Sequence, residues 1–72
     1  MTEEDAIAAA KAVAEERGWP WRGTVRARRT KTLFKRRVRW QIDTNTEALG
    51  MNIVVVIDAA SGDLVRAGYL PR

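Results

Sequence analysis

The fold is decided by residues 52–69, which read NIVVVID, AASGD and LVRAGY in succession. The first piece is a run of β-branched residues, and such a run is typical of a strand. Its unbroken apolar character indicates a central strand that is shielded on both faces or paired in a dimer. Gly62 supplies the positive φ of a hairpin turn over 58–63. In the returning strand, residues 64, 66 and 68 share one face, and residues 65, 67 and 69 share the other.

Two more strands are predicted upstream, because apolar and polar residues alternate there with a period of two. In the segment 24–29, Val25 and Ala27 face inward and the arginines between them face outward. In the segment 36–43, the outward residues are Arg37, Arg39 and Gln41, and the inward residues are Val38, Trp40 and Ile42. Residues 30–35 connect these strands, with Leu33 and Phe34 at the tip of the hairpin or paired in a longer one. Residues 44–50 have turn chemistry at Asn45 and Gly50.

An amphipathic helix over residues 2–17 precedes the strands. Thr2 can cap its first turn, and Asp5 stands in the capping-box position. Gly18 is suited to end the helix. The apolar stripe is rich in small side chains, which let the helix lie close against a sheet; it consists of Ile7, Ala10, Val13 and Ala14. Trp19 and Trp21 follow the helix and are expected to cover a small core rather than to stack on bases.

A chain of 72 residues makes a single domain, residues 1–72. The order of elements predicts an α+β fold, in which one N-terminal helix packs on a four-stranded antiparallel β-meander. A domain of this size buries only about 60% of the surface that its unfolded chain exposes, so the core is thin. The helix covers one face of the sheet and leaves the other face to the outward residues.

Several function classes are excluded or disfavoured by composition. The chain has no cysteine and no histidine, which removes disulfides, thiolate metal sites and every Ser-His or Cys-His dyad. Asp58 and Asp63 bracket a turn, but their spacing lacks the ligands of a calcium loop. We therefore expect a non-enzymatic protein without cofactor or metal. No apolar run is long enough to cross a bilayer, and the acidic start is unlike a signal peptide. These features predict a cytoplasmic chain, or a mature extracytoplasmic fragment whose signal has been removed.

The strongest functional signal is a basic block at residues 22–39, which holds nine Lys and Arg residues and no acidic one. Alternation places four of them on one strand-pair face, and we predict that this face binds an anionic partner; they are Arg26, Arg28, Arg37 and Arg39. Arg29, Lys35 and Arg36 are expected at the hairpin margin of that face. The alternative interpretation is a solvated face whose arginine stems cover apolar surface, or a charged edge that prevents aggregation. The uniform positive sign favours binding, because like charges across a strand pair repel.

The block fits two classes of partner. An acidic protein surface is favoured, and sequence-tolerant nucleic-acid binding by the same face is the alternative. Single-strand binders usually add aromatic side chains for stacking, and no outward position of these strands holds one. A third possibility is a homodimer formed through the strand Ile53–Ile57, which would join two basic faces.

Three pieces of the chain carry a resemblance to a known family. They are the helix TEEDAIAAAKAVAEERGW (2–19), the strand WQIDTN (40–45) and the hairpin NIVVVIDAASGDLVRAGYLP (52–71). Together they resemble small bacterial PepSY-like and cystatin-like domains. The repeat unit of those domains pairs such a helix with a strand ending W-x-V/I and a hairpin V-x-I-D-x-x-T/S-G-x-L/V. Small immunity proteins of bacterial toxin systems are similar to a lesser degree. The resemblance implies a non-enzymatic module that binds or inhibits another protein, often near the cell envelope, and it implies no catalytic residue.

Overall fold

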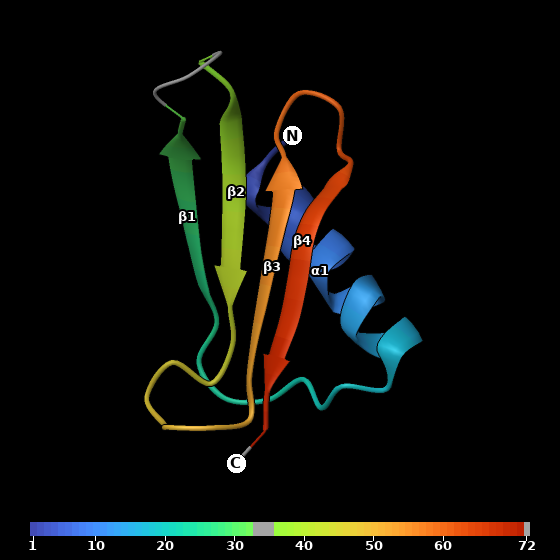
Figure 1. The fold of residues 1–72 in the computed structure, drawn as a ribbon, viewed down its shortest axis with the longest axis vertical. Coiled ribbons are helices and arrows are strands. Elements are labelled where there is room, and N and C mark those ends of the chain that lie inside the picture. The colour runs from blue at the N-terminus through green and yellow to red at the C-terminus, as the bar shows by residue number, and fades with distance from the viewer. Residues whose placement is uncertain (33–35, 72) are drawn as a thin grey trace.

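The chain folds as one helix followed by a four-stranded antiparallel sheet, which confirms the predicted α+β meander (Figure 1). The structure is a computed structural model that describes residues 1–32 and 36–71. Its elements are α1 (Glu3–Arg17), β1 (Arg26–Lys31), β2 (Val38–Asp43), β3 (Asn52–Asp58) and β4 (Leu64–Leu70). The strands lie in the order β1-β2-β3-β4, so β2 and β3 are central and the other two are edges.

Both ends of α1 carry the caps that the sequence predicts. The Thr2 side chain accepts a hydrogen bond from the Asp5 N–H at 3.1 Å, and the Asp5 carboxylate accepts one from the Thr2 N–H at 3.1 Å. These hydrogen bonds hold the pKa of Asp5 below its ordinary value. At the other end Gly18 has φ 72°, a left-handed conformation that costs glycine little, and its N–H bonds to the last turn.

Two strands begin later than the sequence predicts, and the sheet partner explains one of these starts. Two strand ends differ as well. β1 runs to Lys31 rather than ending at residue 29, so residues 30 and 31 belong to the strand and not to the connection, and β4 ends at Leu70 rather than at residue 69. β1 begins at Arg26 rather than at residue 24, because its first residue lies opposite Asp43, the last residue of β2. Beyond Asp43 the chain turns away, so residues 24 and 25 have no strand to pair with. β2 begins at Val38 rather than at residue 36, where Arg36 has a φ of 49° that is incompatible with a strand. The predicted positions of Leu33 and Phe34 lie outside the described residues.

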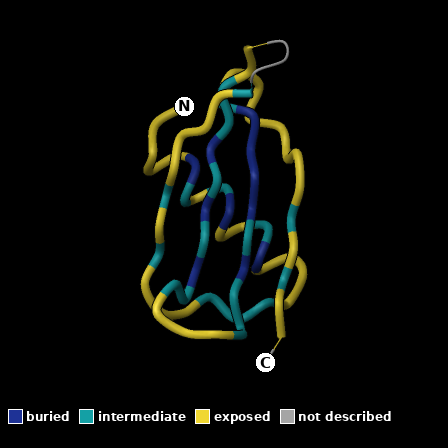
Figure 2. The backbone as a smooth tube through the Cα atoms, turned by 60° about the vertical axis from the view of Figure 1, so that its left-hand side comes forward, coloured by how far each residue is buried: buried dark blue, intermediate teal, exposed yellow. Residues whose placement is uncertain are grey.

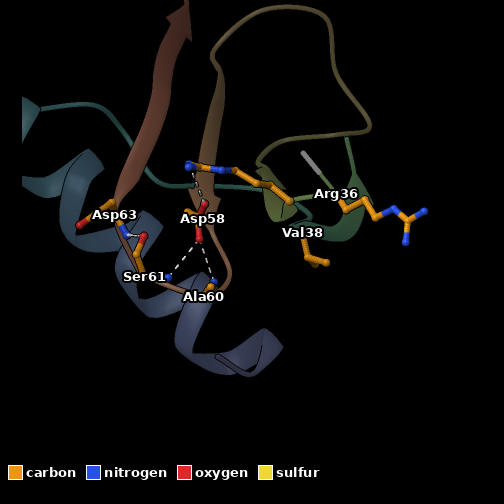
Figure 3. Close-up of a pocket in the computed structure, with 7 residues that line it drawn as sticks. Arg36, Val38, Asp58, Ala60, Ser61 and Asp63 are labelled. Atoms are coloured by element: carbon orange, nitrogen blue, oxygen red, sulfur yellow. Dashed lines mark hydrogen bonds and ion pairs between the residues drawn. The ribbon is translucent and has the colours of Figure 1, made fainter. Parts of the chain in front are cut away.

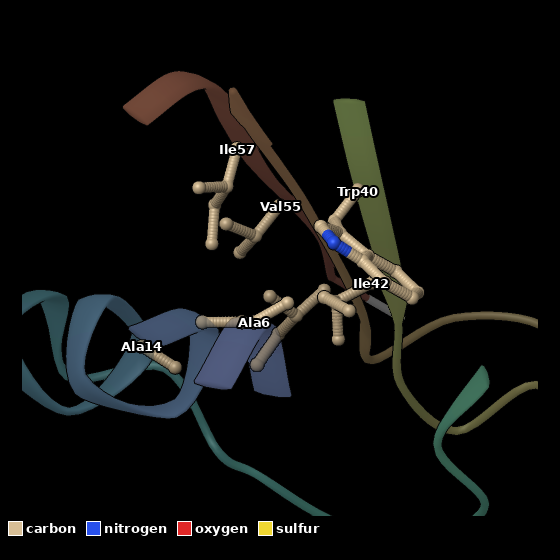
Figure 4. Close-up of a cluster of buried hydrophobic side chains, with 8 residues drawn as sticks. Ala6, Ala14, Trp40, Ile42, Val55 and Ile57 are labelled. Atoms are coloured by element: carbon tan, nitrogen blue, oxygen red, sulfur yellow. The ribbon is translucent and has the colours of Figure 1, made fainter. Parts of the chain in front are cut away.

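The core lies between α1 and one face of the sheet (Figure 4). Alanines of the helix meet branched side chains of the two central strands, and every member is at most 8% exposed: Ala6, Ala10, Ala14, Trp40, Ile42, Ile53, Val55 and Ile57. Figure 2 shows the buried positions running along the two central strands and the inner side of the helix. Trp19 and Trp21 pack against this core, as predicted, and Trp19 stacks on Tyr69 with ring centroids 5.9 Å apart.

Asn52 makes several of the side-chain hydrogen bonds that hold the β2–β3 connection, and Asn45 and Thr44 add one each. The amide nitrogen of Asn52 donates to the carbonyl of Asn45 at 2.8 Å and to that of Thr44 at 3.1 Å, and its amide oxygen accepts from the Gly50 N–H at 2.8 Å. Gly23, in the segment that leads from the helix to β1, touches the same connection. It has φ 74°, and a Cβ there would lie 2.8 Å from the Asn45 Cα, so the site admits only glycine.

Candidate functional site: the open face of the sheet

The sheet face opposite α1, here called the open face, gathers five arginines. In the register of the sheet, Arg26 and Arg28 of β1 lie opposite Asp43 and Gln41 of β2. Arg39 of β2 lies between Thr30 of β1 and Asp58 of β3, and Arg66 of β4 lies opposite Val56 of β3. Arg37, just before β2, reaches the same side through its contact with Asp58. Figure 1 views the sheet with α1 behind it, so this face is turned toward the reader.

The centre of the open face is apolar. Val56 is only 6% exposed although no helix covers it, and Val54 is half-buried. Long polar side chains from the neighbouring strands supply the cover, because Gln41 and Arg66 flank Val56 in the register. The run 53–57 is therefore covered by α1 on one side, and on the other side Gln41 and Arg66 lie beside Val56 while Val54 stays half-buried. The central position of this strand, predicted from its composition, is confirmed.

The open face is not purely positive, which corrects the uniform sign expected from the sequence. Asp43 forms an ion pair with Arg28 at 3.3 Å, and Asp58 forms one with Arg37 at 3.8 Å. Both aspartates are the last residues of their strands, and antiparallel pairing brings them beside arginines that are distant in sequence. The Gln41 amide also donates to both carboxylate oxygens of Asp43, at 3.2 and 3.4 Å. These contacts reduce the repulsion that five neighbouring arginines would otherwise suffer.

The carboxylate of Asp58 is committed to the turn that follows it (Figure 3). One oxygen accepts from the N–H groups of Ala60 at 2.9 Å and Ser61 at 3.0 Å. These hydrogen bonds lower the pKa of Asp58, against the opposing effect of burial, and Arg37 lowers it further. The side chain lines a hollow of about 560 Å³ between the two hairpin ends. These hydrogen bonds confirm the interpretation of Asp58 as a turn residue.

Three arginines of the open face form no ion pair within residues 1–32 and 36–71: Arg26, Arg39 and Arg66. The Arg39 Nε is buried and has no hydrogen-bond partner among the described residues. Arg39 and Arg66 border a hollow of about 190 Å³ with Val56 among its lining residues, together with Thr30 and Gln41. Two guanidinium groups that border one hollow without an ion pair to any described residue favour an anionic group there. Arg26 borders a second hollow of about 310 Å³, which has Val54 among its lining residues.

The four arginines predicted as the anion-binding set, Arg26, Arg28, Arg37 and Arg39, are brought together on the open face. Arg29 is not part of it, which corrects its expected place at the margin. It lies opposite Trp40 on the helix-side face, with its guanidinium carbon 5.7 Å from the ring centroid of Trp40. Successive side chains of a strand point to opposite faces of the sheet. Arg28 lies on the open face, so its neighbour Arg29 lies on the helix-side face.

The remaining predicted margin residues divide between the hairpin end and the undescribed part of the chain. Arg36 lines the hollow at the end of the sheet, and its guanidinium points away from Asp58 (Figure 3). Lys35 lies outside the described residues. Arg66 was absent from the predicted set; the alternation in residues 64–69 placed it on the face opposite to Ala67 and Tyr69 but did not say which face is outward.

Other chemistries find little support in the part of the chain that the structure describes. It holds no group of three or more acidic residues suited to a metal ion. None of its helices is long and apolar enough to cross a membrane. The tryptophans and Tyr69 belong to the core or pack against it, so the described open face offers no ring on which a base could stack.

Comparison with known proteins returns no match: no family model, no curated protein and no solved structure is significantly similar to this chain.

Proposed function

We propose that this protein is a non-catalytic binding module whose open face docks on an acidic surface of a partner protein and occludes it. The observation that carries the proposal is the set of unpaired arginines around an apolar centre, Arg26, Arg39 and Arg66 beside Val54 and Val56. Five arginines against two carboxylates leave an excess of positive charge on this face.

The arrangement fits a protein partner because charged groups surround apolar surface. Partner carboxylates would accept paired N–H groups from the guanidinium forks, a geometry that arginine satisfies better than lysine. Apolar side chains of the partner would cover Val54 and the edge of Val56, and the arginines would act as the polar rim. The charge also steers encounter, so association should be fast and should slow as salt is added.

Nucleic-acid binding by the same face is the competing proposal, and two observations weigh against it. Asp43 and Asp58 stand among the arginines and would repel a phosphate backbone. The described part of the face also has no aromatic side chain to stack on a base. A carboxylate-rich protein surface meets the same two aspartates but can place its own polar groups around them.

The test compares two kinds of fluorescein-labelled probe: a polyglutamate peptide, and random oligonucleotides in single- and double-stranded form. Fluorescence anisotropy is measured at about 50 mM and about 200 mM salt, a range over which phosphate contacts weaken steeply. We expect the protein to bind polyglutamate at low salt and to bind the oligonucleotides less tightly. Tighter binding of the oligonucleotides would replace the proposal with the nucleic-acid alternative, and binding of neither probe would contradict both.

A matched pair of variants locates the binding face. The double substitution Arg39→Glu with Arg66→Glu reverses two unpaired arginines of the open face. The control, Lys11→Glu with Arg22→Glu, makes the same change of charge at exposed positions on α1 and on the segment before β1. We expect the open-face variant to lose about tenfold or more in affinity, and the control to change much less. Equal losses would mean that only net charge matters and would contradict a specific face.

A further inference from the structure

The two edges of the sheet differ in a way that the open face does not explain. β1 reads RARRTK and carries four basic residues, whereas β4 reads LVRAGYL and carries one. Three large apolar side chains of β4 are exposed: Leu64 at 42%, Val65 at 42% and Leu70 at 62%. An edge strand with charged residues resists pairing with another chain, and one without them invites it. β1 is therefore protected, and β4 is not.

The backbone of β4 has peptide groups that no strand uses. The Thr44 N–H donates to the Ile53 carbonyl, and the Ala59 N–H donates to the Val38 carbonyl, so these odd-numbered residues of the β3 segment turn their peptide groups toward β2. Hydrogen-bonded and non-hydrogen-bonded pairs alternate along an antiparallel ladder. Val54 and Val56 therefore turn theirs toward β4, where they meet Gly68 and Arg66. The peptide groups of Ala67 and Tyr69 consequently point to the outer edge.

We propose that β4 pairs antiparallel with β4 of a second copy of this chain and joins two sheets into one of eight strands. The free peptide groups at Ala67 and Tyr69 would complete a ladder, and the exposed apolar side chains of β4 would be covered. The inference does not depend on the proposed docking function. It would, however, place two open faces side by side on a continuous surface.

The single charge of β4 does not oppose pairing with a second copy. An antiparallel register centred on Ala67 sets Arg66 of one copy opposite Gly68 of the other, so no like charges face one another. The contact is isologous and closes after two copies. The two outer edges of the dimer are then the basic β1 strands, which repel further copies and prevent growth into a fibre.

This interface differs from the third possibility drawn from the sequence, a homodimer through Ile53–Ile57. A dimer formed by edge pairing of Ile53–Ile57 is impossible, because β3 already has β2 on one side and β4 on the other. The apolar character of that segment reflects its central position in the monomer.

Sedimentation velocity at about 10 μM and about 500 μM tests the proposal, because a reversible dimer depends on protomer concentration. We expect the protein to move from monomer toward dimer over this range. A monomer at both concentrations would overturn the proposal, and so would species larger than a dimer.

Two pairs of variants test the edge. Ala67→Pro removes an N–H that points outward and leaves the β3–β4 ladder intact, and Lys31→Pro does the same at the outer edge of β1. We expect Ala67→Pro to remain monomeric and Lys31→Pro to dimerise as the unmodified protein does. The reverse result would assign the interface to β1 and overturn the proposal.

The second pair acts through side chains only, in case proline disturbs folding. Leu64→Lys with Leu70→Lys adds charge to exposed positions of β4, and Ala8→Lys with Ala12→Lys adds the same charge to the exposed side of α1. The β4 variant should lose the dimer, and the α1 variant should keep it. Dimerisation of the β4 variant to the same extent as the unmodified protein would contradict the interface. Circular dichroism confirms that each variant is folded.

Discussion

The two faces of the sheet are built from alternate residues of the same strands, yet they serve different purposes. Toward α1 the strands present Ile42, Ile53 and Val55, which are fully buried. Toward solvent the same strands present arginines and aspartates around a narrow apolar strip. The comparison shows that burial alone does not distinguish the faces, since Val56 of the open face is nearly as buried as Val55. What differs is the cover: a packed helix on one side and solvated side chains on the other.

A loss of stability as large as that of a truncation in the core is expected at Asn52, a residue on the open-face side of β3 whose role is structural. Asn52→Ala would leave the carbonyls of Thr44 and Asn45 and the N–H of Gly50 without their partner. Because several hydrogen bonds at the β2–β3 connection are lost together, we expect the free energy of unfolding to fall by about 2–3 kcal/mol. Urea denaturation measures it. If the free energy of unfolding falls by less than a typical surface substitution would lower it, the β2–β3 connection does not depend on the Asn52 side chain.

Neighbouring valines provide a direct comparison of the two faces. Val55→Ala removes two methyl groups from a packed core, and we expect a loss of about 2–3 kcal/mol from lost burial and the cavity left behind. Val56→Ala removes the same groups beneath arginine stems that can settle into the space, so a loss of about 1 kcal/mol is expected. Both values come from urea denaturation. Equal losses would mean that the open face is packed as tightly as the core.

A smaller effect is expected at the partly exposed ion pair on the open face. Asp43→Asn keeps a side chain of the same shape and releases Arg28, which is 49% exposed in its side chain. Exposed ion pairs contribute little, so stability should change by about 0.5 kcal/mol or less. Affinity for polyglutamate should rise, because the face gains an unpaired arginine. Weaker binding of polyglutamate would show that Asp43 takes part in recognition rather than opposing it.

The smallest effect concerns pH. The pKa of Asp58 is lowered in the folded protein by hydrogen bonds from Ser61 and Ala60, so its carboxylate stabilises the fold above the unfolded pKa of about 3.9. That contribution is lost as the pH falls through the lower folded value. Asp58→Asn keeps an oxygen acceptor for the turn and cannot titrate. The stability difference between the two proteins should therefore narrow between about pH 5 and about pH 2 in denaturation experiments. A constant difference would assign the acid sensitivity to other groups.

Most of the fold could be predicted because local patterns agree with one another. The capping residues Thr2 and Gly18 define the helix, and the apolar run before Gly62 defines the final hairpin. The alternation of Val38, Trp40 and Ile42 correctly assigned the inward side of β2. Strand ends were less predictable, since β1 begins where β2 stops and not where its own pattern stops.

The site was only partly predictable, because its charge balance depends on register. The alternation of residues along each strand correctly placed the outward arginines on one face. The strand pairing, which the sequence does not give, brings Asp43 beside Arg28 and Asp58 beside Arg37. Arg66 is distant from the basic block in sequence and joins the face through β4. A bulge between Val56 and Ile57 changes the pairing near the start of β4, so Leu64 lies opposite Ile57 on the helix side. No pattern in the sequence indicates that bulge.

The central claim is that the open face, and not the helix side, receives an acidic partner. Amide chemical shifts in ¹⁵N-labelled protein, recorded during titration with polyglutamate at low salt, test it most directly. The account predicts that the largest shifts occur at Arg39, Gln41, Val56 and Arg66, with little change along α1. Shifts concentrated on α1 or on the segment from residue 18 to residue 25, or no shifts at all, would contradict it.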